Sequence, residues 1–173
     1  GVLFDSMKNH ATAWNKAMKL YNMTLTEEEA YMHEGRTGAS TINIVSVRER
    51  GYEATEEEIK EIYKTKSDIF NGLPKAKRMP GALEVLTQIK ENGLTPMVVT
   101  GSGQLSLLDK LNHNFPNIFQ EHLMVTAFDV KYGKPNPEPY LMALKKAGIN
   151  ANQAIVIENA PLGVQAVSYT HLR

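Results

Sequence analysis

A carboxylate and an amide directly after an apolar run give the first indication of chemistry in this sequence. Residues 154–157 are rich in β-branched side chains, which predicts a strand buried on both faces, and Glu158 and Asn159 follow it. Ligands of open α/β sheets bind beyond the carboxyl ends of the strands, and Mg²⁺ prefers oxygen ligands. The two side chains are therefore candidate metal ligands. Taken alone, the pattern also fits an Asn159 helix cap ahead of Pro161 with an exposed glutamate.

Two further polar side chains are candidates for the same site. Thr100 ends the apolar run 95–100 and is followed by Gly101 and Ser102, and Lys134 lies in a polar loop. The transition state of phosphoryl transfer spreads negative charge over the phosphoryl oxygens, so a hydroxyl, backbone amides, an ammonium and a metal site would stabilise it. Each group alone has an ordinary interpretation as a strand end, a solvated loop or a cap. Their occurrence in this order favours a phosphate site.

Composition excludes several classes of function. The 173 residues contain 19 basic and 19 acidic side chains, which gives no indication of a surface for nucleic acid. The chain has no cysteine, so disulfides, thiol nucleophiles and thiolate metal sites are absent. No apolar run approaches the ~20 residues that span a bilayer, and no signal-peptide pattern opens the chain. We expect a cytoplasmic protein without a membrane partner.

The predicted elements change in kind near residue 79. Earlier residues predict only helices and turns, and capping boxes at Thr26 and Thr55 open two of the helices. Later, short apolar runs alternate with amphipathic stretches, which is typical of a parallel, doubly wound sheet. We expect an α/β fold with a Rossmann-like parallel sheet core (1–7 and 79–173) and an inserted all-helical cap (8–78). The expected strands are 95–100, 122–126 and 154–158, and the expected core helices begin near residues 80, 104 and 137.

Over residues 1–166 the chain resembles the haloacid dehalogenase-like hydrolases, in the helical-cap subgroup that includes β-phosphoglucomutase and small phosphatases. Residues 1–6 resemble the end of that family's first motif, which begins Asp-x-Asp-Gly. Thr100 matches the second motif, Lys134 the third, and Glu158 with Asn159 the acidic fourth.

The resemblance implies a mechanism and roles for these residues. In the family an aspartate attacks phosphorus and forms an aspartyl-phosphate. Thr100 and Lys134 would hold the transferring group, while Glu158 and Asn159 would orient Mg²⁺. The cap would close to exclude water. Candidate substrate contacts are Gly101, Ser102 and Gln104 in the second-motif loop, and Arg36 and Lys66 in the cap, although a solvated surface is the simpler interpretation of Lys66.

The chain also departs from the family pattern. The two aspartates of the first motif would lie before Gly1, on a central strand between 95–100 and 154–158, and Asp5 lies beyond the motif's glycine and does not replace them. We therefore expect a fragment, incomplete at both ends, that does not form an aspartyl-phosphate. Residues 167–173 show no clear apolar period to continue a helix, which leaves open whether they are native or foreign sequence. Asn159 stands where many relatives carry a second aspartate, so its site would bind Mg²⁺ with lower charge.

The sequence favours a Mg²⁺-dependent phosphatase of a small phosphorylated metabolite, such as a sugar phosphate. No basic residue follows Ser102, and Arg36 is offset from the position that binds a second phosphate in mutases. His10 favours the opposite conclusion, because His10 and Trp14 match the His-x-x-x-Trp hinge of mutase-like members; alternatively His10 is simply a packed or surface residue. A non-catalytic binding module with a vestigial phosphate site is the third interpretation.

Overall fold

The protein is described by a computed structural model, which covers residues 1–103 and 107–170. Its regular elements are mostly helical. No helix in the described part of the chain is long and apolar enough to cross a bilayer. In chain order the elements are α1 (Met7–Leu20), α2 (Glu27–Met32), α3 (Gly38–Arg50), α4 (Glu56–Asn71), α5 (Ala82–Glu91), α6 (Leu107–Asn114), η1 (Glu121–Leu123), α7 (Glu138–Ala147), η2 (Ala151–Gln153) and α8 (Pro161–Ser168).

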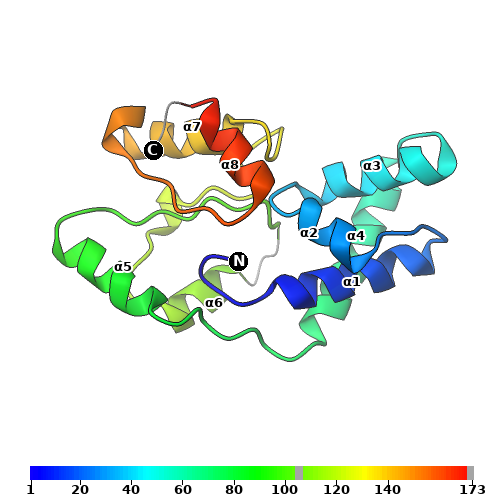
Figure 1. The fold of residues 1–173 in the computed structure, drawn as a ribbon, viewed down its shortest axis with the longest axis horizontal. Coiled ribbons are helices and arrows are strands. Elements are labelled where there is room, and N and C mark those ends of the chain that lie inside the picture. The colour runs from blue at the N-terminus through cyan, green and yellow to red at the C-terminus, as the bar shows by residue number, and fades with distance from the viewer. Residues whose placement is uncertain (104–106, 171–173) are drawn as a thin grey trace.

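Helices α1 to α4 gather at one end of the molecule around a shared apolar cluster (Figure 1). Met18, Ile42 and Ile62 are fully buried in this cluster, and α4 packs along α1. Both predicted capping boxes are confirmed, because Thr26 and Thr55 exchange hydrogen bonds with the glutamates three residues later. These helices occupy the predicted cap, while its boundary at residue 78 stays a prediction.

A second apolar cluster lies beneath the loops that follow the predicted strands. It joins Phe4, Val98 and Phe115 with the inner sides of α5 and α6. The rings of Phe4 and Phe115 meet edge to face at 5.5 Å between centroids, which fixes the first residues of the chain against α6. The chain therefore buries its side chains in two separate cores.

The predicted parallel sheet is not confirmed. In the described residues, β pairing is limited to two isolated bridges, a parallel one between Val99 and Val125 and an antiparallel one between Phe4 and Arg78. The parallel bridge consists of Thr100 N–H donating to Val125 O (2.9 Å) and Val125 N–H donating to Val98 O (2.8 Å). The predicted strand 122–126 is wrong in its first half, because η1 occupies residues 121–123. The hydrophobic pattern identified extended segments here, but an extended segment becomes a strand only when its backbone pairs with a neighbouring segment.

The segment 154–158 is extended, but it is not buried on both faces. The prediction of a doubly buried strand is wrong here. Ile155 is 78% exposed and Ile157 is 73% exposed. Within the described chain, no backbone hydrogen bond involves residues 155–157. The helix predicted at Pro161 is present as α8, with Ala160 rather than Asn159 as its N-cap residue. The segment stays exposed because no strand among residues 1–103 and 107–170 pairs with it.

Candidate functional site

Lys134 and Glu158 form a buried ion pair at the centre of the candidate site. The Lys134 ammonium lies 2.5 Å from Oε2 of Glu158 and 3.4 Å from the carbonyl oxygen of Val99. Only 7% of the Lys134 side chain and 10% of the Glu158 side chain are exposed. The lysine reaches from the loop before α7, and the glutamate ends the extended segment 154–158, so the pair joins two distant parts of the chain.

Both oxygens of the Glu158 carboxylate accept hydrogen bonds from described donors. Oε2 accepts from Lys134 and from the Tyr140 hydroxyl at 2.6 Å, and Oε1 accepts from the backbone N–H groups of Asn159 and Ala160 at 2.9 and 3.0 Å. Burial opposes ionisation of Glu158, but Lys134 and these hydrogen bonds outweigh it and hold its pKa below the ordinary value. Burial and the adjacent carboxylate raise the pKa of Tyr140, which therefore stays a neutral donor.

Tyr140 is a residue that the sequence analysis missed. It is 3% exposed and lies on the inner side of α7, one turn before Ala143. The helical spacing of Tyr140 and Ala143 indicates a core position for Tyr140. The hydrogen-bond partner of its hydroxyl could not be predicted, because Glu158 lies 18 residues away in the sequence.

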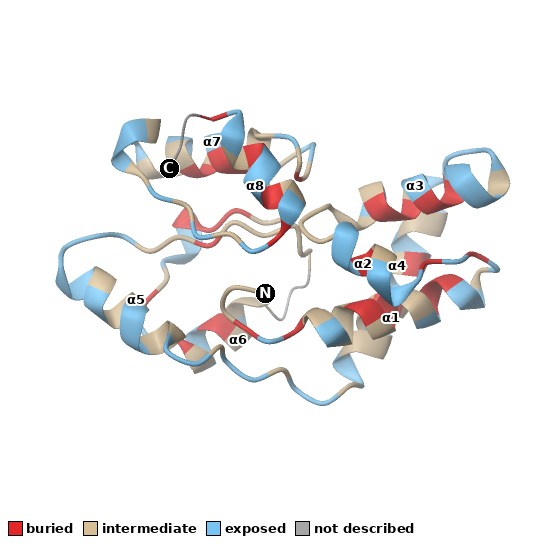
Figure 2. Ribbon diagram, in the orientation of Figure 1, coloured by how far each residue is buried: buried red, intermediate tan, exposed pale blue. Residues whose placement is uncertain are grey.

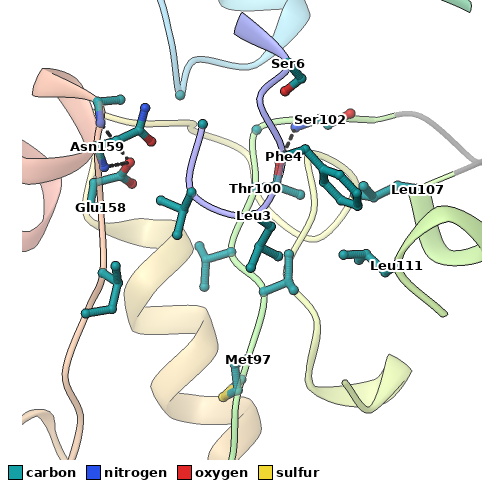
Figure 3. Close-up of a pocket in the computed structure, with 18 of the residues that line it drawn as sticks. Leu3, Phe4, Ser6, Met97, Thr100, Ser102, Leu107, Leu111, Glu158 and Asn159 are labelled. Atoms are coloured by element: carbon teal, nitrogen blue, oxygen red, sulfur yellow. Dashed lines mark hydrogen bonds between the residues drawn. The ribbon is translucent and has the colours of Figure 1, made fainter. Parts of the chain in front are cut away.

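Thr100 and Ser102 lie in the same cavity as the ion pair. Thr100 Oγ1 accepts a hydrogen bond from the Ser102 N–H at 3.1 Å, which shapes the loop after the extended segment 95–100. The cavity measures about 1680 Å³ and is also lined by Gly101, Lys134 and Glu158. Figure 3 shows Thr100 and Glu158 across the cavity from each other, with Leu3 between them. The other candidates at this cavity are Asn159, His10, Arg36 and Lys66; Gln104 lies outside the described residues.

The two predicted metal ligands fit Mg²⁺ in chemistry but not in number. Asn159 donates its side-chain N–H to Glu34 at 3.2 Å, which leaves the amide oxygen available as a ligand. Among residues 1–103 and 107–170, no group of three or more His, Cys, Asp or Glu side chains could hold a metal ion. Because Mg²⁺ takes about six oxygen ligands, most of them would have to come from water, substrate or further groups.

A cap loop lies directly on the loops of the site. A Cβ atom added to Gly101 would lie 2.6 Å from the carbonyl oxygens of Gly35 and Arg36, and one added to Gly133 would lie 2.8 Å from Thr37. The Gly103 N–H also donates to the hydroxyl of Tyr63 at 3.1 Å. These glycines allow backbone to approach backbone, so the cap is closed over the ion pair.

Arg36 is part of this cap loop. Its Nε atom is buried and has no hydrogen-bond partner among the described residues, and the same holds for Nδ1 of His33. Burial lowers the pKa of the Arg36 guanidinium from its ordinary value. A buried donor without a partner is costly, and it marks a position where a polar or anionic ligand would be stabilised.

Lys66 and His10 form a second buried pair, between α4 and α1. Lys66 Nζ lies 3.0 Å from His10 Nδ1, and the His10 ring stacks on Phe70 at 4.2 Å. Lys66 is 3% exposed and lies over the rings of Trp14, Tyr63 and Phe70, so its interpretation as a solvated residue is wrong. Helical spacing contained this signal, because Lys66 is four residues after Ile62, which faces the core.

Burial shifts the pKa values of both partners. It lowers the pKa of His10 to about 2, with a further contribution from the Lys66 charge. It also lowers the pKa of Lys66 to about 8 from 10.5. At neutral pH the pair is therefore a neutral imidazole that accepts a hydrogen bond from an ammonium.

The first prediction concerns the pH dependence of stability at Lys66. Between about pH 8 and pH 10.5 the folded protein releases this proton while the unfolded chain keeps it. The unfolded state then binds more protons, so the free energy of unfolding rises with pH. Lys66→Met should remove this rise and increase the free energy of unfolding at pH 7 by roughly 2 kcal/mol.

Urea unfolding of both proteins at several pH values measures this difference. Lys60→Met is the matched control, because Lys60 is exposed on the same helix. A rise between pH 8 and 10.5 that persists in Lys66→Met would contradict the assignment.

The second prediction concerns cap closure. Gly101→Ala should hold the cap away from the core, because its methyl group would lie against two carbonyl oxygens of the cap loop. The chain has no cysteine, so Val47→Cys on α3 and Leu141→Cys on α7 provide two exposed labelling sites. A distance distribution between spin labels should shift to longer values in Gly101→Ala. Gly72→Ala, whose added Cβ makes only ordinary contacts, should leave it unchanged; the same distances in all three proteins would refute the closed arrangement.

Comparison with known proteins identifies a group of phosphate-handling relatives. The chain is 26% identical over 165 residues to hexitol phosphatase A of Escherichia coli (strain K12), covering 95% of this chain and 73% of that protein. It is 26% identical over 167 residues to the phosphorylated carbohydrates phosphatase of Thermotoga maritima, covering 96% of this chain and 76% of that protein.

A solved structure and a family model extend this result. The structure described as "Putative beta-phosphoglucomutase from Bacteroides vulgatus" superposes with a TM-score of 0.94 at 72% identity, covering 99% of this chain and 69% of that chain. The model of the haloacid dehalogenase-like hydrolases matches residues 1–171. The chain belongs to the haloacid dehalogenase-like hydrolase family.

Proposed function

We propose that this chain carries the phosphate-holding residues of an enzyme that transfers the phosphoryl group of a small phosphorylated carbohydrate. The observation that supports this is the arrangement of Thr100, Lys134 and Glu158 around one cavity beneath a closed cap. The names of two relatives, a hexitol phosphatase and a phosphorylated carbohydrates phosphatase, support the substrate class.

In this proposal the chain's own groups bind and orient the phosphate. The Thr100 hydroxyl and the Gly101 N–H would donate to phosphoryl oxygens, and the Lys134 ammonium would neutralise their charge, while the Ser102 N–H positions the Thr100 side chain. Glu158 keeps Lys134 in place. With the amide oxygen of Asn159 it would hold Mg²⁺ only if the ion replaced one of the hydrogen-bond donors on its carboxylate. When bound, Mg²⁺ would add positive charge beside the phosphate.

The described residues offer no carboxylate suited to attack phosphorus. The acidic side chains that line the cavity are Glu34, Asp109 and Glu158. Glu158 already accepts hydrogen bonds from four donors, Asp109 is exposed, and Glu34 contacts Asn159 from the cap. Asp5 is exposed and is not among the lining residues. We therefore propose that these 173 residues bind a phosphate ester and do not by themselves form an aspartyl-phosphate.

The cap supplies the groups that would contact the rest of the substrate. Arg36, in the cap loop, has an Nε atom without a partner among the described residues, and Lys66 with His10 lines the same cavity from α4 and α1. Arg36 and Lys66 line the same cavity as the Lys134–Glu158 pair. They would bind carbohydrate hydroxyls or a second anionic group.

The third prediction tests phosphate-ester binding directly. Lys134→Met should weaken binding of a hexitol phosphate by roughly tenfold or more, because the ammonium contributes a charge-assisted hydrogen bond. Isothermal titration in the presence of Mg²⁺ measures it. Lys145→Met, on an exposed position of α7, is the matched control and should bind as the unsubstituted chain does.

Lys134→Met leaves Glu158 buried and unpaired, so its fold must be checked by circular dichroism. Thr100→Val provides an independent variant that keeps shape and removes the hydroxyl, and it should also weaken binding. Equal affinity in all four proteins would refute the proposed site. Sustained release of phosphate by the unsubstituted chain would refute the absence of a nucleophile.

A phosphoglucomutase is the second candidate function. The relative at 72% identity is described as such an enzyme, and the buried His10–Lys66 pair involves the histidine whose hinge motif favours it. The fourth prediction discriminates the two reactions in a protein that carries an Asp-x-Asp strand ahead of Gly1. With glucose 1-phosphate and a bisphosphate primer, a hydrolase should release free phosphate, whereas a mutase should form glucose 6-phosphate.

A further inference from the structure

Glu138, the first residue of α7, holds the loop that carries Lys134. Its Oε1 accepts a hydrogen bond from the backbone N–H of Lys131 at 2.9 Å, and its Oε2 accepts one from the backbone N–H of Tyr132 at 2.8 Å. Both carboxylate oxygens are therefore directed back across the loop at two successive amides. Hydrogen bonds to a charged acceptor are stronger than neutral ones, so this contact fixes the loop more firmly than an ordinary turn does.

Further hydrogen bonds close the same loop from within. The Glu138 N–H donates to Oδ1 of Asn136 at 2.9 Å, and the Asn136 N–H donates to the carbonyl oxygen of Gly133 at 3.0 Å. Lys134 thus lies between two anchored points of the loop. Little conformational freedom is left at the residue whose ammonium reaches the candidate site.

Tyr140 connects the same helical turn to the other half of the ion pair. Its hydroxyl donates to Oε2 of Glu158 at 2.6 Å, and the Lys134 ammonium binds the same oxygen. α7 has a buried side that includes Tyr140 and an exposed side that includes Leu141 (Figure 2). The first turn of α7 therefore contacts the backbone of the Lys134 loop through Glu138 and the partner of the Lys134 ammonium through Tyr140.

These contacts form a closed network around Lys134. From the ammonium the network runs through Glu158 and Tyr140 to the first turn of α7, and from there through Glu138 to the loop that carries the lysine backbone. Both ends of the lysine side chain are thus fixed to one helical turn. Such support matters for a long side chain, because an unsupported one loses more rotamer entropy when it binds an anion.

From this network we infer that Glu138 is a positioning residue for Lys134, which directs the ammonium at the phosphate of the substrate. Glu138 is not among the described residues that line the cavity, so it acts on a ligand only through the loop. The inference rests on the proposed function, because that proposal assigns phosphate binding to Lys134.

A purely structural role for Glu138 has a different consequence. A carboxylate in the first turn of a helix also stabilises the helix by its charge, and Glu84 lies in the first turn of α5. In a purely structural role, loss of Glu138 would lower the free energy of unfolding and leave the phosphate-ester affinity of the folded protein unchanged. Affinity therefore separates the two roles.

The experiment titrates the 173-residue chain and its variants with sorbitol 6-phosphate in the presence of Mg²⁺, by isothermal titration. Glu138→Met removes both acceptors and should weaken binding roughly fivefold, because the loop then no longer fixes Lys134. Glu138→Gln keeps one carbonyl oxygen that accepts one of the two N–H groups, so its affinity should lie between. Glu84→Met, at an exposed position of α5, is the matched control and should bind as the unsubstituted chain does.

Two further measurements test whether Glu138 acts through Lys134. The amide proton resonances of Lys131 and Tyr132 should move upfield in Glu138→Met, which reports loss of the two hydrogen bonds in the folded protein. In a Lys134→Met background, Glu138→Met should cause no further loss of affinity, because the ammonium that it positions is absent. A further loss of the same size in that background would show a general effect on the fold and would overturn the inference.

The outcomes also separate this inference from the proposed function. If Lys134→Met weakens binding while both Glu138 variants bind as the unsubstituted chain does, the inference fails and the phosphate site stands. If Lys134→Met itself binds with unchanged affinity, the proposed phosphate site fails and the inference fails with it. Glu138→Gln in both backgrounds provides the same comparison if Glu138→Met does not fold.

Discussion

The Glu158 carboxylate is the group on which the rest of the site depends. It ends the extended segment 154–158, accepts hydrogen bonds from Lys134 and Tyr140, and binds the backbone at the start of α8. A buried ion pair adds little net stability by itself, because the cost of removing two charges from water offsets their attraction. Loss of one partner is expensive, however, since the other stays buried and unpaired. The pair therefore fixes where the loop before α7 can lie.

The position of that loop decides where the cap can close. Gly133 lies next to Lys134 and contacts Thr37 of the cap, while Gly35 of the cap contacts the Lys134 side chain. Gly35 has φ of 93°, a conformation that other residues rarely adopt, so the cap loop can turn tightly over the lysine. The position of the ion pair and the closure of the cap are thus linked, because the cap loop and the loop that carries Lys134 are in contact.

The sequence predicted the parts of the site that follow from local pattern. Thr100 and Glu158 were chosen as candidates because each follows an apolar run, and Lys134 because its charge in a polar loop fits the same chemistry; the structure places all three at one cavity. Lys66 was misinterpreted because its charge received more weight than its spacing on α4, where it takes a core position. Tyr140 was missed because its partner is distant in sequence. The sheet could not be predicted from periodicity alone, because strand pairing depends on neighbours that a local pattern does not specify.

The charges around the cavity explain why closure and ligand binding belong together. Lys134 has Glu158 as its partner, but Lys66 and Arg36 have no ion-pair partner among the described residues. Helices α1 and α4 bury Lys66 within the cap, and the Nε atom of Arg36 is buried as well. Burial of these cations costs free energy, which the aromatic rings around Lys66 offset only in part. An anion in the cavity would neutralise this excess positive charge. In the proposed function, closure over an anionic ester would be more favourable than closure over an empty site, and this difference would couple the cap to phosphate binding.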